Sequence, residues 1–255
     1  MSSNNPNSNS SMPKVFDASY YDASYFSDLK GKDFRRPDGS IDHWGYRNPE
    51  GEWLGCKPIV EAWKTMFNPK NALDVGCGRG TFVTYMRDVD IKAEGFDFSG
   101  WSIDHHYPRC NKKWIRNYDA TKPWPYPDKS FDFVTVLDLM EHIYIDDIYF
   151  VVNEMYRVAK KWIFLQIATV REGSSDSTHE NGYIIRKGDT VPVELEGCTV
   201  AGHITVSTEG FWVQRLKRDG WIVRGDLVEE FCRIVPRDVI ANWILNTIII
   251  LEKVK

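Results

Sequence analysis

The sequence has no excess of basic residues and no closely spaced pair of cysteines, and each absence narrows the possible protein classes. Its 255 residues include 32 lysines and arginines against 36 aspartates and glutamates, so the net charge of −4 argues against an overall basic surface for nucleic acid. The five cysteines are odd in number and form no C-x-x-C pair, which argues against a disulfide framework or a zinc site and suits a reducing cytoplasm. They are Cys56, Cys77, Cys110, Cys198 and Cys232.

Long apolar runs are also missing. The stretch Ile244–Leu251 is too short to cross a bilayer and predicts a buried strand. The first 12 residues are rich in serine and asparagine and lack the apolar core of a secretory signal. There is no P-loop, no G-x-S-x-G elbow and no internal repeat. The length and the 42% of apolar residues fit one α/β domain with some additions.

The most informative stretch lies at residues 72–87. The apolar run Ala72–Val75 predicts a buried strand, and Thr81–Arg87 continues with helical spacing. Between them stand Gly76, Gly78 and Gly80, which allow a sharp turn and a close approach of the backbone to a ligand. A strand, a glycine turn and a helix form the usual cofactor site of an open α/β sheet. The spacing is G-x-G-x-G, whereas a dinucleotide site has G-x-G-x-x-G, and this argues against an NAD-dependent oxidoreductase.

This turn, with Asp74 two residues before its first glycine, resembles motif I of the class I S-adenosylmethionine-dependent methyltransferases. The resemblance implies S-adenosylmethionine as cofactor, S-adenosylhomocysteine as product, and a place for Asp74 near the methionine end of the cofactor. The alternative is that Asp74 only caps the following helix. The cofactor-binding residues that we expect are Asp74, Gly76, Cys77, Gly78, Gly80, Asp97, Phe98, Asp119, Ala120 and Asp138.

Two later acidic residues follow predicted strands. Asp97 ends a strand over 91–97, where a carboxylate can accept hydrogen bonds from both ribose hydroxyls; the alternative is an N-cap for a helix over 99–106. Asp119 and Ala120 follow a strand over 113–118, and the resemblance implies that they bind the adenine amino group, although turn chemistry is an alternative for Asp119. Residues 123–132 read P-W-P-Y-P-D-K-S-F-D and resemble the P-F-P-D-x-S-F-D segment of the family.

A fourth strand, Phe131–Leu137, leads into Asp138, Glu141 and His142. Ligands bind at the carboxyl ends of strands in this architecture, so these side chains should lie near the reactive end of the cofactor. His142 is a candidate general base, and we expect Glu141 to contact the substrate. The D-x-x-E-H pattern also resembles the E-x-x-E-H of metal-dependent ubiquinone-type O-methyltransferases, with a shorter first acid. A purely structural histidine is the third alternative, and we assign no metal ligand.

His203 is the second candidate base, because many sugar and small-molecule methyltransferases have a histidine at the corresponding place. Ser207 is a plausible N-cap for a helix that ends at Arg218. The remaining predicted elements are helices over 58–67 and 145–159, strands over 162–168 and from Trp221, a hairpin pairing 183–186 with 190–194, and a last antiparallel strand over 243–253.

The chain divides into three expected parts. Residues 1–13 form a disordered tail, 14–56 an aromatic arm, and 57–255 the methyltransferase domain with an insertion or lid over 170–205. The arm, with Tyr20-Tyr21-Asp22, loosely resembles an N-terminal extension that covers the cofactor in small-molecule and sugar methyltransferases; a packed surface strap is the alternative. Within it we expect Tyr46 and Trp53 to contact the substrate.

Together these features predict an α/β fold: a doubly wound, mostly parallel, seven-stranded Rossmann-like sheet with helices on both faces. The expected reaction is O- or N-methylation of a small molecule or a saccharide. RNA or protein acceptors are an alternative, and so is a regulatory module that binds the cofactor without transferring methyl.

Overall fold

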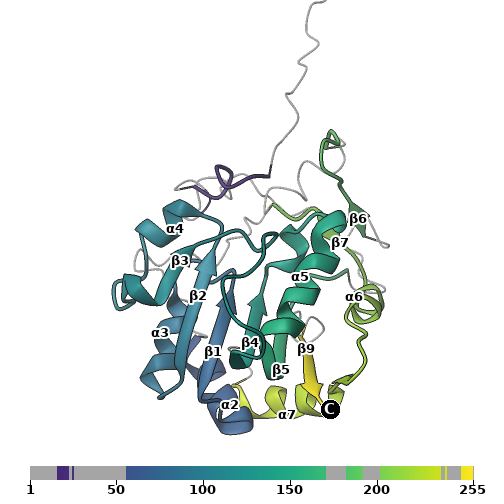
Figure 1. Ribbon diagram of the computed structural model, residues 1–255. Coiled ribbons are helices and arrows are strands. Elements are labelled where there is room, and N and C mark those ends of the chain that lie inside the picture. Colours follow the sequence, from purple (N-terminus) through teal and green to yellow (C-terminus); the bar gives the residue numbers. More distant parts are fainter. Residues whose placement is uncertain are drawn as a thin grey trace, which may run out of the picture.

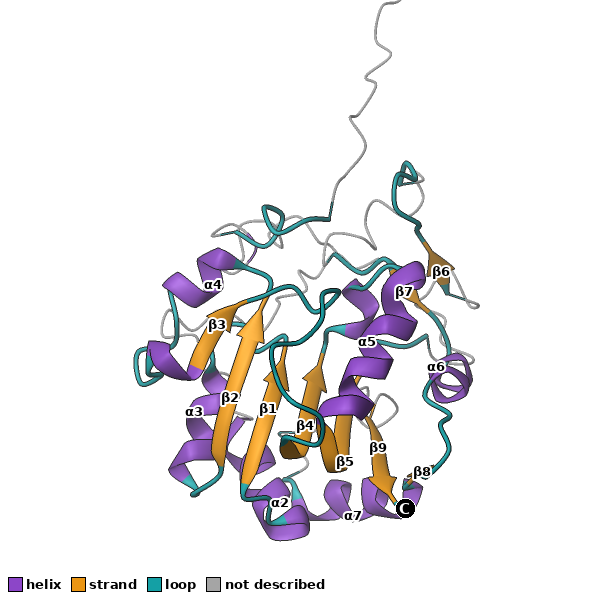
Figure 2. Ribbon diagram, viewed as in Figure 1, coloured by secondary structure: helices purple, strands orange, loops and turns teal. Residues whose placement is uncertain are grey.

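The computed structural model describes residues 16–22, 25, 56–170, 182–191, 202–236, 239 and 248–254. Seven strands form one sheet in the order β3-β2-β1-β4-β5-β9-β8 (Figures 1 and 2). The strands are β1 (Asn71–Val75), β2 (Lys92–Asp97), β3 (Ile115–Asn117), β4 (Phe131–Leu137), β5 (Ala159–Gln166), β8 (Trp221–Val223) and β9 (Ile248–Lys253). The first five pair in parallel, whereas β9 runs antiparallel to β5 and β8. The predicted doubly wound, mostly parallel sheet and its antiparallel last strand are therefore confirmed.

Helices cover both faces of the sheet, which is why its central strands are mostly apolar. The helices are α2 (Cys56–Phe67), α3 (Thr81–Asp88), α4 (Gly100–Asp104), α5 (Ile145–Val158), α6 (Glu209–Arg215) and α7 (Gly225–Ile234). On one face α2, α3 and α7 pack together, and the Trp63 ring lies edge-on to Phe133 and Phe164 at 5.4 and 5.1 Å. Among these described helices none is long and apolar enough to cross a membrane.

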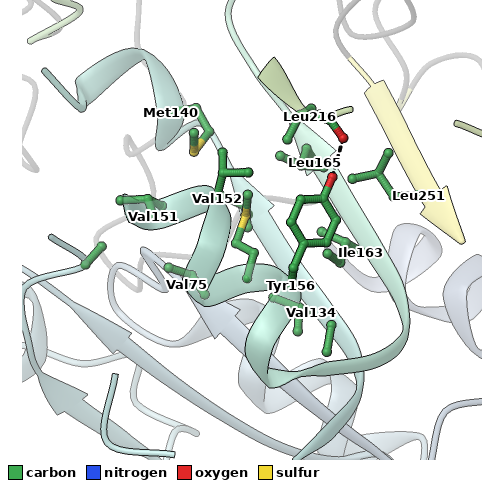
Figure 3. Packing of buried hydrophobic residues seen from close by; sticks show 14 of the residues in the cluster. Val75, Val134, Met140, Val151, Val152, Tyr156, Ile163, Leu165, Leu216 and Leu251 are labelled. Atoms are coloured by element: carbon green, nitrogen blue, oxygen red, sulfur yellow. Dashed lines mark hydrogen bonds between the residues drawn. The ribbon is translucent and has the colours of Figure 1, made fainter. Parts of the chain in front are cut away.

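The other face is covered by α5 and α6. Side chains of α5 such as Val151 and Val152 pack on Val134 and Leu165 of the sheet (Figure 3). The Tyr156 hydroxyl donates a hydrogen bond to the Leu216 carbonyl, which ties α5 to the end of α6. This apolar layer packs on β4 and β5, which pair in parallel up to Leu137 and Gln166. The carboxyl ends of the two strands are therefore fixed side by side.

A second, small sheet lies at the carboxyl ends of the parallel strands. It pairs β6 (Tyr183–Ile184) with β7 (Thr205–Val206) in antiparallel fashion. The predicted pairing of 183–186 with 190–194 is therefore wrong, because the partner strand comes from the segment next to His203; residues 192–194 lie outside the described part. Pairing over a long separation cannot be found from local alternation alone.

Three smaller corrections concern the ends of two elements and one helix that was not predicted. Thr208, rather than Ser207, caps α6, since its hydroxyl accepts from the Phe211 amide. The predicted strand over 113–118 is shortened, because a 3-10 turn over Lys112–Trp114 precedes β3. Helix α7 has no counterpart in our predictions, although its amphipathic face buries Phe231. Predicted features outside the described residues are the tail, most of the arm with Tyr46 and Trp53, and 171–181.

Candidate functional site

The glycine turn lies between β1 and α3, at the carboxyl end of the sheet (Figure 1). The amides of Gly76 and Cys77 donate to the Phe96 carbonyl at 2.9 and 3.0 Å, which attaches the turn to β2. Gly78 has a φ of 51°, and a Cβ there would meet no atom within 4 Å. The turn is thus held by its neighbours on one side and leaves space at Gly78 for a ligand.

A glycine that our sequence analysis did not select makes this close packing possible. Gly95, in β2, faces the turn so closely that a Cβ on it would lie 2.7 Å from the Cβ of Cys77. Such a distance is well inside van der Waals contact, so any side chain at this position must displace the turn. The only local signal was a glycine inside a predicted strand, which often marks a close backbone approach.

Asp97 ends β2 and connects this strand to the glycine turn and to the start of α4. Its Oδ2 accepts from the Gly78 amide at 2.8 Å, and its Oδ1 accepts from the Ser99 amide at 2.8 Å and the Ser102 hydroxyl at 3.3 Å. Burial raises the pKa of Asp97, and these hydrogen bonds oppose the shift. A carboxylate has about four lone-pair sites, so one site remains for a ribose hydroxyl. The N-cap of α4 is Ser99, so the alternative role of Asp97 as that cap is wrong.

Asp74 lies one strand away, in β1, and is only 2% exposed. The Thr135 hydroxyl of β4 donates to its Oδ1 at 2.7 Å. The pKa of Asp74 is raised to about 7, mainly by burial and to a smaller extent by the charge of Asp97. The hydrogen bond from Thr135 lowers this pKa but does not offset the effect of burial. The N-cap of α3 is Gly80, and no side chain in the described part of the chain caps this helix. The alternative role of Asp74 as the cap of α3 is therefore wrong.

Asp119 and Ala120 follow β3. The Asp119 Oδ1 accepts from both the amide and the hydroxyl of Thr121 at 2.8 Å, which is the turn chemistry of the alternative. The Ala120 carbonyl accepts from the Trp124 indole at 2.9 Å. Asn117 also fixes the backbone between these segments, because its amide group donates to the Asp97 and Phe98 carbonyls. The adenine contact of Asp119 and Ala120 stays a prediction.

At the end of β4, Asp138 adopts a left-handed backbone conformation with a φ of 46°. Its carboxylate accepts from the Gln166 side chain of β5 at 3.2 and 3.3 Å. Burial raises the pKa of Asp138 to about 6, and the bond from Gln166 opposes this. Asp138 is thus bound to the neighbouring strand, which the sequence pattern D-x-x-E-H did not indicate.

Glu141 belongs to the 3-10 turn η3 (Met140–His142) and is completely buried. The Ala168 amide donates to its Oε1 at 3.1 Å, while its Oε2 has no hydrogen-bond partner in the described structure. Burial, together with the charge of Asp138, holds the pKa of Glu141 well above its usual range. The His203 Nε2 lies 4.0 Å from Glu141 Oε1.

The two candidate bases lie against each other, although 60 residues separate them in the sequence. The rings of His142 and His203 have centroids 4.9 Å apart. The Gly202 carbonyl lies 3.0 Å from His142 Nδ1, and because a carbonyl only accepts, Nδ1 carries the proton and Nε2 the lone pair.

Burial lowers the pKa of His142 to about 4, although the hydrogen bond to the Gly202 carbonyl raises this pKa by a smaller amount. Burial also places the pKa of His203 well below its usual range, and His142 lowers it further. Both rings are neutral at pH 7.

Two backbone-anchored contacts hold the His203 segment over η3. The Ile204 amide donates to the Glu141 carbonyl at 2.8 Å, and the Thr205 hydroxyl donates to the Ile143 carbonyl at 2.8 Å. Because these bonds join the segment after the insertion to the end of β4, they explain why Glu141, His142 and His203 converge.

Tyr21, which we did not select as a site residue, connects the two sides of the site. Its hydroxyl lies 3.2 Å from His142 Nδ1, and its carbonyl accepts from the Ser99 hydroxyl at 2.5 Å. The segment 16–22 lies above the carboxyl ends of the strands (Figure 1). Its Phe16 and Tyr20 pack against Ile185, Val191 and Ile204. The repeated tyrosines at 20–21 were the only signal for this contact.

Comparisons with known proteins agree with this geometry. A family model described as a methyltransferase domain matches residues 54–223. The fold is similar to that of the plantazolicin methyltransferase BpumL, solved with a monoazolic desmethylPZN analog and SAH, at 16% identity, 93% coverage of this chain, 95% of that chain and a TM-score of 0.56. It is also similar to the plantazolicin methyltransferase BamL, solved with a triazolic desmethylPZN analog and SAH, at 14% identity, 82% coverage of this chain, 89% of that chain and a TM-score of 0.52. The PH0226 protein of Pyrococcus horikoshii OT3 is similar at 17% identity, 78% coverage of this chain, 88% of that chain and a TM-score of 0.51. No curated protein sequence matches the chain significantly.

Proposed function

The chain belongs to the methyltransferase domain family, and from this premise we propose that it methylates an oxygen or nitrogen atom of a small molecule or a saccharide. S-adenosylmethionine is the methyl donor of this family, and S-adenosylhomocysteine is the product. The proposal rests on one observation: Glu141, His142 and His203 converge at the carboxyl end of the sheet that also holds the glycine turn.

The residues on the cofactor side suit this donor. The open side of Gly78 permits close approach to the backbone, and Asp97 keeps an acceptor site for a ribose hydroxyl. We assign Asp74, buried beside Thr135, to the methionine end, and Asp119 with Ala120 to the adenine. The donor supplies an electrophilic methyl group on a sulfonium. The protein aligns the acceptor atom with that group and keeps water out of the site.

On the acceptor side, we assign proton removal to the His142 and His203 pair. A hydroxyl must lose its proton as its oxygen attacks the methyl carbon, and a neutral imidazole is a suitable acceptor for that proton. The Nε2 of His142 carries the lone pair, and the Glu141 Oε1 lies 4.0 Å from the His203 Nε2. An amine acceptor that is already neutral needs no such base.

The net charge and the surroundings of the site support a small acceptor. A net charge of −4 provides no general attraction for RNA. Aromatic side chains gather beside the histidines: Tyr21 touches His142, and Tyr20 lies edge-on to Tyr21 at 5.4 Å. The plantazolicin methyltransferase BpumL, which has a similar fold, is solved with a monoazolic and with a pentazolic desmethylPZN analog.

The first test is binding. We expect S-adenosylmethionine and S-adenosylhomocysteine, but not NAD, to raise the melting temperature, because a ligand at a hundred times its Kd stabilises a fold by about 2.7 kcal/mol. The second test measures S-adenosylhomocysteine release with phenols, sugars, amines, RNA and a peptide mixture as acceptors. Turnover with RNA or peptide alone would overturn the acceptor class. Binding without turnover would support a regulatory module instead.

A further inference from the structure

We propose that Glu141, His142 and His203 form a binding site for a divalent transition-metal ion, of which zinc is the best match. Each of these three residues offers a donor atom within 4.8 Å of those of the other two. One carboxylate and two imidazoles are the donors of many catalytic zinc sites, which keep a fourth position open. The set differs from the D-x-x-E-H pattern, since His203 takes the place of Asp138, which is bound to Gln166.

The state of the Glu141 carboxylate is the strongest reason for the proposal. The side chain is completely buried, one oxygen accepts from the Ala168 amide, and the other has no partner among the residues that the structure describes. A buried carboxylate oxygen without a partner is costly, and native structures nearly always satisfy such a group with a hydrogen bond, a water or an ion. A cation held by the free oxygen would satisfy it, while the Ala168 amide would keep the carboxylate in orientation.

The surroundings of His142 fit a ligand as well. Metal-binding histidines usually donate their second ring N–H to a carbonyl or carboxylate, which fixes the tautomer. The Nδ1–H of His142 donates to the Gly202 carbonyl at 3.0 Å in this way, which leaves the Nε2 lone pair for the ion. The backbone bond from Ile204 to Glu141 holds the neighbouring His203 segment against the same turn.

The donor atoms of Glu141, His142 and His203 must move closer together to bind zinc. Ligand atoms about 2.0–2.2 Å from a tetrahedral zinc lie about 3.3–3.6 Å from one another. The three donor atoms lie within 4.8 Å of one another, so these side chains must move closer by up to about 1.5 Å. The His203 side chain is 19% exposed and Glu141 is completely buried, so we expect His203 to make most of this movement.

The role of the ion in methyl transfer, unlike its binding, rests on the proposed function. A metal with three protein ligands keeps a position for the hydroxyl oxygen of an acceptor and lowers the pKa of that hydroxyl. The proton then leaves to solvent, the O–C bond forms, and the C–S bond of the donor breaks with its electron pair left on sulfur. With the ion bound, the lone pairs of both histidines are used, so the general-base role proposed above describes the chain without a metal.

The test uses the full chain, freed of metal by a chelator and dialysed. We expect Zn²⁺ to bind one per chain in calorimetry, and Co²⁺ to give the visible d–d bands of a site with nitrogen and oxygen ligands. The Glu141→Gln and His203→Asn variants should each lose affinity at least tenfold. The His105→Asn variant, which changes an exposed histidine, and the Asp138→Asn variant should bind as the unchanged chain does. Circular dichroism shows which variants are folded.

Four results would overturn the metal site. They are no stoichiometric Zn²⁺ binding, unchanged affinity in folded Glu141→Gln and His203→Asn, a loss in Asp138→Asn as large as in Glu141→Gln, and selective binding of Mg²⁺, for which imidazole is a poor ligand. These readouts are independent of the proposed function. If S-adenosylhomocysteine stabilises the chain but Zn²⁺ does not bind, the metal site alone fails. If Zn²⁺ binds and the cofactor does not, the proposed function alone fails.

Discussion

The two sides of the site are assembled in different ways. On the cofactor side, Gly78, Asp97, Ser99 and Ser102 come from one short stretch of chain and are joined largely through backbone amides. On the acceptor side, Tyr21, His142 and His203 come from three distant segments, and they meet through side chains. Backbone contacts within one βαβ unit persist through most substitutions, whereas side-chain contacts between distant segments change with single residues.

This difference suggests a division of roles. The cofactor side is part of the folded sheet, so changes there should affect both stability and donor binding. The acceptor side is attached to the sheet by a few contacts of η3 with 203–205, so changes there should affect transfer while the donor still binds. The predictions below test whether the two sides can be separated in this way, beginning with the largest expected effect.

Replacing His203 with alanine should lower kcat for a hydroxyl acceptor by about 10²–10⁴-fold, the usual range for loss of a general base. Donor affinity should stay within a factor of about two, because His203 lies over Glu141 and not over the glycine turn. Initial rates and calorimetry with S-adenosylhomocysteine measure the two quantities. Loss of donor binding in a folded His203→Ala variant would contradict the separation of the two sides.

A second acceptor sharpens this experiment. With an amine that is neutral at the assay pH, no proton needs to be removed before attack, so the loss from His203→Ala should be much smaller. His105→Ala, at an exposed position, is the matched control for removing an imidazole. Equal losses for hydroxyl and amine acceptors would indicate that His203 positions the acceptor rather than removing a proton.

The next largest effect concerns Asp74 and pH. Its pKa is raised from 3.8 to about 7 by burial, so the unfolded chain releases this proton at lower pH than the folded chain does. Stability is therefore lost as pH rises from about 4 to 7, by up to about 4 kcal/mol. Asp74→Asn removes this loss and keeps an acceptor for Thr135. It should melt several degrees higher than the unchanged chain at pH 8, with little difference at pH 4.5.

The same Asp74→Asn variant also tests the cofactor side. If Asp74 contacts the donor, the variant should bind S-adenosylmethionine more weakly even while its fold is more stable. Melting curves with and without donor at both pH values separate these effects. An unchanged melting temperature at pH 8 would show that burial in the fold does not raise the pKa of Asp74.

The contrast between the two sides also explains what the sequence could predict. The strand order and direction follow from the alternation of apolar strands and amphipathic helices. The cofactor contacts stay predictions, which rest on the resemblance at the glycine turn, Asp97 and Asp119. The pairing of β6 with β7 was predicted wrongly, because the partner of Tyr183 lies beyond an insertion and local alternation does not indicate which segment returns. Helix α7 was missed although Leu227, Val228 and Phe231 follow the spacing of an amphipathic helix.

For the site, both histidines could be named from the sequence, but their contact could not. The pattern 138–142 suggested Asp138 as the partner of Glu141 and His142, whereas the structure binds Asp138 to Gln166 and brings His203 into its place. Gly95 and Tyr21 were missed for a related reason. Their importance depends on a close approach between segments, which no spacing within one segment reveals.

Gly95 offers a smaller effect on the cofactor side. The added Cβ in Gly95→Ala would lie 2.7 Å from the Cys77 Cβ and must displace the glycine turn. We expect a loss of about 1–3 kcal/mol in the free energy of unfolding, with weaker donor binding. Gly225→Ala is the matched control, because a Cβ at that helical position would meet nothing within 4 Å. Urea unfolding and calorimetry measure both; a Gly95→Ala variant as stable as Gly225→Ala would contradict the close approach.

Tyr21 gives the smallest and most discriminating effect, because this residue touches both sides. Tyr21→Phe removes the hydroxyl near His142 Nδ1 but keeps the ring and the carbonyl that accepts from Ser99. A hydrogen bond of this kind contributes about 0.5–1.5 kcal/mol, so transfer should slow by about 2- to 12-fold. Donor affinity should not change, since the backbone contact to the cofactor side is intact. A change in donor affinity equal to the change in rate would show that the arm couples the two sides through this hydroxyl, and that they are one cooperative unit.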